Sequence, residues 1–345
     1  MKNVQLILLL LFAHPVHNNA QAPDGPVDHM NYFNALEENL SKKYLSYMSE
    51  VAHGNRARKM EKRRTELLNS VTQAIHEGGK ARPYKGDISL REAYKTYWGV
   101  LLSVFKEDYH KIVDMEEVAE QSYDGMEAYL LTQEKAKEKL NEAYSKVPMA
   151  YEAFALKHGV RLAEGQSTKL SQRLDQAGMV NSYMNTVYLL FFKSYVQEGL
   201  MFKAMQANDV NGLEQSKSSL SKFSAEGLLR LDTLRPFKGD GSLKTACRKV
   251  LEFQKTEADN AFFLTDYHLK KEAFEKTKKS FDTKLVKNRT QDDIDAYNKA
   301  VNDYNMAVKD YNKTSEDLNV AREKVLNNWD ITRKRFMDLH VPYKL

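Results

Sequence analysis

Apolar residues recur at spacings of three and four along most of the chain, so each stretch has one apolar and one charged face. This is the pattern of an amphipathic α-helix, in which positions i, i+3, i+4 and i+7 share a face. The stripe of the first such segment consists of Phe33, Leu36, Leu40, Tyr44, Tyr47 and Val51. The pattern predicts helices over about 28–53, 56–77, 168–207, 209–234, 242–286 and 290–340.

Two further helices are predicted from their start signals. Ser89 is followed three residues later by Glu92, which is the spacing of a capping box, so a helix is expected to start there. Another helix is expected to begin near Tyr123. Its pattern continues past Pro148, where the missing amide of proline predicts a kink or a restart.

A seven-residue repeat distinguishes the last third of the chain. Apolar and aromatic side chains recur there at alternating spacings of three and four, the seam of a coiled coil. The seam residues are Ile294, Tyr297, Val301, Tyr304, Val308, Tyr311, Leu318 and Val325. Tyr267, Phe274 and Phe281 of the preceding helix are also seven residues apart. We therefore predict a long helical hairpin over about 255–325 with its tip near 287–289.

The chain also repeats itself. The segment 82–91, which reads RPYKGDISLR, returns at 235–244 as RPFKGDGSLK, 153 residues later. Matches at a constant offset and in the same order indicate a tandem duplication. The predicted fold class is therefore all-α, with two tandem duplicated antiparallel helical bundles over 28–165 and 166–341, the second carrying the extended coiled-coil hairpin.

Composition agrees with this fold and narrows the chemistry. The 345 residues include only 7 prolines and 15 glycines, too few for the frequent turns of an all-β or α/β chain. A single cysteine, Cys247, excludes a disulfide framework or a cysteine-based metal cluster, and we expect it in the core. The net charge of +5 is too small to indicate a nucleic-acid partner.

The first 22 residues are typical of a secretory signal peptide. Lys2 precedes an apolar run over 6–13, and a polar stretch then ends in Ala20-Gln21-Ala22, an A-x-A cleavage pattern. We therefore predict export, with cleavage near Ala22 and a location in the periplasm or at the cell surface. No cysteine lies near this site, so the protein is not expected to be a lipoprotein, and no later segment offers a transmembrane span.

One constellation suggests metal chemistry. Di-metal carboxylate bundles use Glu-x-x-His pairs, whose i, i+3 spacing places both ligands on one helix face. The chain contains two such pairs, Glu50 with His53 and Glu107 with His110. The alternative reading is that these histidines lie at a bundle edge without a ligand. A carboxylate-histidine metal-binding bundle, oxidoreductase-like in chemistry, is therefore an alternative function.

A second constellation is basic. Six cationic residues lie within nine positions, opposed by Glu61 alone: Arg56, Arg58, Lys59, Lys62, Arg63 and Arg64. One interpretation is a solvated helix face. The other is a surface that binds anionic lipid, polysaccharide or an acidic partner.

The segment 116–129, which reads EEVAEQSYDGMEAY, and the repeated Tyr/Phe-Lys-Gly-Asp loops resemble the ErpY-like family of bacterial surface proteins. This resemblance implies an exported, surface-associated protein without enzymatic activity. The missing lipidation cysteine departs from the lipoprotein members of that family.

From the residues and the resemblance together we predict a non-enzymatic binding or scaffold protein. Its partner would be a protein or a cell-surface polymer and not nucleic acid. We predict no catalytic residue and no cofactor. The tyrosine seam is expected to pack within the hairpin, and a homodimer formed through the hairpin is the alternative.

Overall fold

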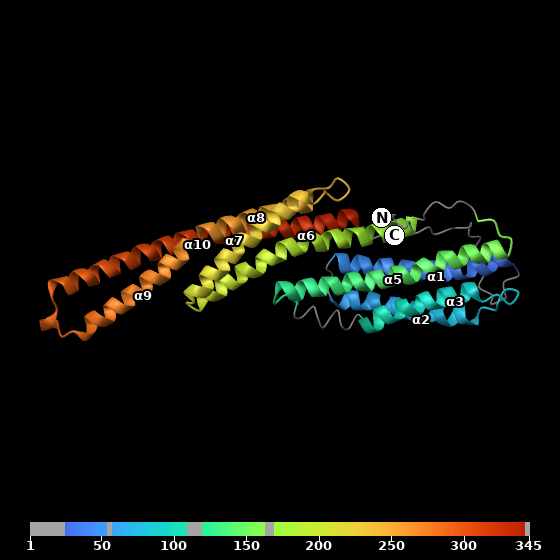
Figure 1. The fold of residues 1–345 in the computed structure, drawn as a ribbon, viewed down its shortest axis with the longest axis horizontal. Coiled ribbons are helices and arrows are strands. Elements are labelled where there is room, and N and C mark those ends of the chain that lie inside the picture. Colours follow the sequence, from blue (N-terminus) through green and yellow to red (C-terminus); the bar gives the residue numbers. More distant parts are fainter. Residues whose placement is uncertain (1–24, 54–56, 109–118, 163–168, 342–345) are drawn as a thin grey trace. The chain divides into compact units, whose positions relative to one another are not determined.

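The computed structural model describes residues 25–53, 57–108, 119–162 and 169–341. This part of the chain is helical and contains no β-strand, as the apolar periodicity predicts. Its helices, coloured along the chain in Figure 1, have bounds close to the predicted ones. They are α1 (Pro26–Ala52), α2 (Ala57–Lys80), α3 (Ser89–Ser103), the π-helical turn η1 (Val104–Asp108), α5 (Tyr123–Lys157), α6 (Lys169–Gln206), α7 (Val210–Thr233), α8 (Ser242–Asn260), α9 (Phe262–Thr283), the 3₁₀ turn η2 (Val286–Asn288) and α10 (Gln291–His340).

The chain divides into two compact units. Unit 1 comprises Met1–Asn185 with Lys334–Leu345, and unit 2 comprises Thr186–Arg333, so α6 and α10 each contribute residues to both. These units are groups of residues that pack compactly, and their bounds differ from those of the predicted duplicated halves, 28–165 and 166–341. The tandem duplication inferred from the repeated segment stays a prediction.

Unit 1 is built around α1, α2, α3 and α5, whose apolar faces enclose one core. Its largest fully buried side chains include Phe33, Trp98 and Phe154, one each from α1, α3 and α5. The approach of α2 to α3 depends on Gly78, because a Cβ atom at that position would lie 2.6 Å from Cζ3 of Trp98. Helix packing in this unit therefore needs a glycine where the indole ring meets α2.

The repeated loop has the same conformation in both halves. Lys85 and Gly86 have φ angles of 49° and 81°, and Lys238 and Gly239 have 50° and 89°. Two consecutive positive φ angles define a type I′ turn, which favours glycine at its second position. The following Asp87 accepts a hydrogen bond from the Ser89 amide at 2.9 Å, and Asp240 accepts one from the Ser242 amide at 2.8 Å.

Two local predictions hold only in part. Helix α3 starts at Ser89 as expected, but its N-cap is Ile88, whose carbonyl accepts the Glu92 amide at 2.9 Å, so the capping box does not form. Helix α5 runs through Pro148 without a restart. Proline removes only one amide donor, and the buried Tyr144, Val147 and Tyr151 hold the helix to the core on both sides of it.

Unit 2 contains α7, α8, α9 and the adjoining parts of α6 and α10. The helix predicted over 242–286 is interrupted at Ala261, which separates α8 from α9. Ala261 is fully buried, and the Phe263 and Leu264 side chains that follow it pack with Met201 and Leu213 in a local core. The end of α8 and the first turn of α9 therefore contribute to the same local core.

None of the helices in the described residues is long and apolar enough to cross a membrane.

Candidate functional site

The most distinctive feature of unit 2 is a hairpin formed by α9, η2 and the first part of α10, residues 262–312, which we call the hairpin (Figure 1). Its two helices are joined by stacked aromatic rings. The ring centroids of Tyr267 and Tyr311 are 4.6 Å apart, and those of Phe281 and Tyr297 are also 4.6 Å apart. Because residue numbers rise along α9 as those of their partners fall along α10, the helices are antiparallel.

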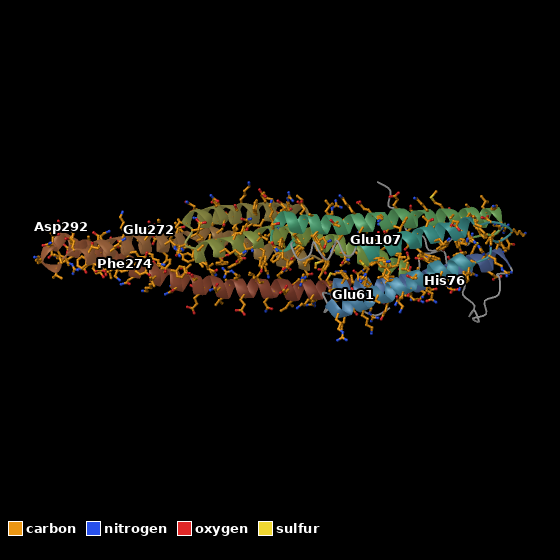
Figure 2. The ribbon with its side chains drawn as sticks, turned by 90° about the horizontal axis from the view of Figure 1, so that it is seen from below. Glu61, His76, Glu107, Glu272, Phe274 and Asp292 are labelled. Carbon is orange, nitrogen blue, oxygen red and sulfur yellow. The ribbon has the colours of Figure 1, made fainter. Side chains whose placement is uncertain are left out.

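The middle of this aromatic ladder is formed by Phe274. Its ring is stacked on Tyr304 at 5.1 Å, with only 2° between the ring planes, and it also contacts Tyr297 at 6.3 Å. The tyrosine seam is thus used to pack α10 against α9 within one chain. In Figure 2 the labelled Phe274 and Glu272 point to opposite sides of the hairpin.

At the tip, residues 284–290, the turn is held by specific contacts. Lys284 Nζ lies 2.5 Å from Asp293 Oδ1, and Asp293 Oδ2 accepts the Thr290 amide at 2.9 Å. The hydrogen bond from Lys284 lowers the pKa of Asp293 to about 2. Arg289 donates to the Phe281 carbonyl at 3.2 Å, and its guanidinium lies 4.2 Å from the centre of the Phe281 ring. The tip is therefore a defined turn, fixed on both helices.

This fixed turn exposes two large apolar side chains. Leu285 is 63% exposed and Val286 is 77% exposed. Turns that only reverse the chain direction favour glycine, asparagine, aspartate, serine and proline. Leu285 and Val286 are thus two adjacent apolar side chains that an ordered turn leaves in solvent.

The root of the hairpin contains a buried polar cluster, which we call the root cluster: Glu198 of α6, Gln254 and Glu257 of α8, and Arg322 of α10. Arg322 Nε is 2.5 Å from Glu198 Oε1, and the same guanidinium is paired with Glu257. Gln254 donates to Glu198 Oε2 at 2.9 Å. One arginine thus bridges two carboxylates and joins three helices where the hairpin begins.

The root cluster holds more negative than positive charge. Glu198 and Glu257 are 3% and 1% exposed, so their repulsion is poorly screened. Burial and then the neighbouring Glu198 charge raise the pKa of Glu257 to about 8. Protonation of Glu257 removes its charge, which relieves the repulsion. The arrangement links α6, α8 and α10 through one arginine.

The first pair of predicted metal ligands has protein partners. Glu50 Oε1 lies 3.6 Å from Nε of Arg63. His53 Nδ1 is 2.6 Å from the Ser49 carbonyl oxygen, and its Nε2 is 3.2 Å from Oδ1 of Asp338. Both side chains therefore already take part in contacts that hold the end of α1.

Of the second pair, Glu107 is exposed on η1, where it accepts a hydrogen bond from Ser103 at 3.2 Å (Figure 2). His110 lies outside the described residues, so the four-ligand site stays a prediction. Within the described ranges, no three histidine, cysteine, aspartate or glutamate side chains group in a way that could hold a metal ion.

The basic cluster separates into two parts. Arg58, Lys59 and Lys62 are exposed on α2, whereas Arg56 lies outside the described residues. Arg64 is instead structural: it pairs with Glu61 at 2.6 Å and donates to the Phe105 carbonyl at 2.9 Å. Phe105 belongs to the π-helical turn η1, where the regular hydrogen-bond pattern is disturbed.

Arg63 is also engaged with neighbouring carboxylates. Besides Glu50, it pairs with Glu66 at 3.0 Å. Of the six cationic residues in the predicted cluster, Arg58, Lys59 and Lys62 therefore form the exposed basic face on the first turns of α2.

Cys247 lies in the core of unit 2, as expected. It is fully buried, and burial raises the pKa of its thiol to about 12. A thiol that stays protonated in this way is a poor nucleophile.

The seven-residue repeat predicts the position of the tip but does not single out Leu285 and Val286, although an apolar pair between two lysines at a predicted turn is visible in the sequence. The root cluster had no such signal, because Glu198 and Arg322 are 124 residues apart. Comparisons with protein-family models, curated proteins and solved structures gave no match to this chain.

Proposed function

We propose that this protein is an exported, non-enzymatic binding or scaffold protein, and that the hairpin of unit 2 is its binding element. The observation that carries the proposal is the tip: Leu285 and Val286 are exposed on a turn that Lys284, Arg289 and Asp293 hold in one conformation. An ordered apolar surface loses little conformational freedom on binding, which favours association.

The rest of the hairpin supports this role. The stacked rings of Phe274 and Phe281 with Tyr297 and Tyr304 stiffen α9 against α10, and the root cluster braces the base. A stiff arm with an apolar end presents that end to a partner. Because α9 already occupies the tyrosine seam, a homodimer would need another face of the hairpin.

The predicted location follows from the sequence. The signal-peptide pattern before Ala22 and the resemblance to ErpY-like surface proteins both favour a site outside the cytoplasm. The partner classes open to an exported binding protein are another protein, a cell-surface polymer and a lipid surface.

The test is site-specific photo-crosslinking in the cells that make the protein. A benzophenone amino acid replaces Lys287 at the tip, or Glu252 on the exposed face of α8 as the matched control. We expect one discrete adduct, to protein, polymer or lipid, from position 287 and none from position 252. Equal adducts from both positions, or no adduct from position 287, would contradict the proposal.

A further inference from the structure

We propose that the tip of the hairpin docks on an anionic lipid bilayer, with Leu285 and Val286 inserted to the boundary between the headgroups and the acyl chains and the surrounding lysines facing the lipid phosphates. This inference rests on the proposed function and names its partner class. It begins from the side-chain exposures of 63% and 77% on two consecutive residues. Leu285 is the N-cap residue of the 3₁₀ turn η2 and Val286 is its first residue, so both lie in the turn that joins α9 to α10.

The part of the chain that leads into this apolar pair is mostly basic, although the net charge over residues 276–295 is only +2. Between residues 276 and 289 six basic residues face a single acidic one, Asp282, and the six are Lys276, Lys278, Lys279, Lys284, Lys287 and Arg289. Lys276, Lys278, Lys279 and Lys287 are exposed. Each basic residue near an anionic membrane surface adds to the attraction, and the contributions accumulate over a Debye length.

The acidic residues across the tip do not cancel this charge. Asp292, Asp293 and Asp295 lie in the first turn of α10, where carboxylates complement the positive end of the helix dipole. Asp293 is further neutralised by Lys284 at 2.5 Å. Over residues 276–295 six basic side chains still outnumber four acidic ones.

The combination of features favours a bilayer over the other partners. A polyanionic polysaccharide would match the lysines but offers no apolar phase for Leu285 and Val286. An apolar groove on a protein would match this pair but gives no reason for the lysines on the flanks of the turn. An anionic bilayer supplies an apolar interior beneath a layer of negative charge, which is the environment that surface-binding segments with apolar and basic faces use.

The experiment is vesicle flotation of the chain from residue 23 onward, which omits the apolar predicted leader. Vesicles of phosphatidylglycerol mixed with phosphatidylcholine are compared with vesicles of phosphatidylcholine alone. We expect flotation with the mixed vesicles only, weakening as salt rises because the charges become screened.

Two pairs of variants locate the contact. The apolar pair is Leu285→Ser with Val286→Ser, and its control is Met306→Ser with Val320→Ser, which changes exposed apolar residues on α10. The charge variant carries Lys278→Glu, Lys279→Glu and Lys287→Glu. Its control makes the same change in net charge at three exposed lysines of α10, Lys309, Lys313 and Lys324.

We expect each tip variant to weaken binding by about tenfold or more, and each control to retain it within about threefold. Far-ultraviolet circular dichroism verifies that all variants keep their helix content. A tryptophan reporter adds a direct readout: emission from Val286→Trp should shift to the blue with phosphatidylglycerol vesicles, whereas emission from Met306→Trp should not.

The outcomes separate this inference from the proposed function. If the unmodified chain does not float with anionic vesicles, or if the controls lose binding as much as the tip variants, the bilayer is not the partner. A protein adduct from position 287 would then leave the proposed function standing. Failure of both vesicle binding and crosslinking would overturn both proposals.

Discussion

At the scale of single residues, two adjacent glycines allow the steric requirement for glycine to be distinguished from its low helix propensity. Gly78 and Gly79 both lie in the last turn of α2. A Cβ atom on Gly78 would meet Trp98 at 2.6 Å, whereas a Cβ atom on Gly79 would have no neighbour within 4 Å. The same substitution at adjacent positions should therefore have opposite effects.

We predict that Gly78→Ala lowers the free energy of unfolding by about 1–3 kcal/mol, because the fully buried Trp98 has little room to move. Gly79→Ala should raise it by about 0.5 kcal/mol through helix propensity. Urea denaturation of both variants measures the difference. Equal effects at the two positions would show that α2 does not approach Trp98 as described.

At the scale of elements, the hairpin depends on ring contacts and not on a broad core. Phe274 is half-buried between Tyr304 and Tyr297, whereas Glu272 is exposed. Isolated helix pairs gain most of their stability from such packed faces.

We predict that Phe274→Ala destabilises the hairpin by about 2 kcal/mol through lost burial and stacking. Amide hydrogen exchange over 291–304 should accelerate, while exchange in α1 stays unchanged. Glu272→Ala is the control, and it should change the local stability of either region by no more than about 0.5 kcal/mol. Uniform acceleration in the two units, or none in 291–304, would contradict a locally stabilised hairpin.

The root cluster shows how a charged group can link elements. A single residue, Arg322, pairs with both Glu198 and Glu257, and its guanidinium also lies 4.6 Å from the centre of the Phe202 ring. Removing one partner of a buried ion pair leaves an uncompensated charge, which costs more than the pair contributes. The cluster therefore favours one register of α6, α8 and α10 over its alternatives.

At the scale of the whole molecule, both units bury a carboxylate with a raised pKa. Burial raises the pKa of Glu37 to about 7, although Trp98 and Ser41 donate to it. In unit 2, burial and the Glu198 charge raise the pKa of Glu257 to about 8. A carboxyl whose pKa is raised on folding binds its proton more tightly in the folded state, so stability falls as pH rises.

We predict that the free energy of unfolding falls between about pH 5 and pH 8, the interval between the unfolded and folded pKa values of these groups. Glu37→Gln combined with Glu257→Gln should reduce this fall by about 1–3 kcal/mol, because an amide mimics the protonated acid and does not ionise. Denaturant titrations at several pH values measure it. An unchanged slope in the double variant would show that other groups set the pH dependence.

Histidine produces the opposite trend at lower pH. His29 is 1% exposed, and its two ring nitrogens have no hydrogen-bond partner among the described residues. Its ring instead packs on Phe154 and Phe33, and burial lowers its pKa. A histidine with a lowered pKa contributes stability that is lost as pH falls below about 6.5. Below about pH 6.5 this contribution opposes the fall caused by Glu37 and Glu257, so the fall in stability should be steepest between about pH 6.5 and pH 8.

Part of this structure could be predicted because its signals are local or periodic. The seven-residue spacing of Tyr297, Tyr304 and Tyr311 predicted the seam on which α9 packs. The loop that the sequence repeats has a positive φ angle at Gly86 and at Gly239, which few residues other than glycine adopt without strain.

Other features depend on tertiary contacts, which the hydrophobic periodicity of the sequence does not reveal. Pro148 does not restart α5, because the surrounding core holds the helix. The break between α8 and α9 at Ala261 lies in a local core that also buries Phe263 and Leu264. Arg64 was read as surface charge, yet it supports a carbonyl of η1 on another helix.

The sequence alone determined the all-α class, the positions of most helices and the hairpin, because hydrophobic periodicity and turn residues act over a few residues. Only the tertiary structure decided which charges are buried together, which cations of 56–64 are already paired, and that Leu285 and Val286 stay in solvent. These properties depend on residues far apart in the chain. Burial, pairing and exposure exist only once the helices have packed.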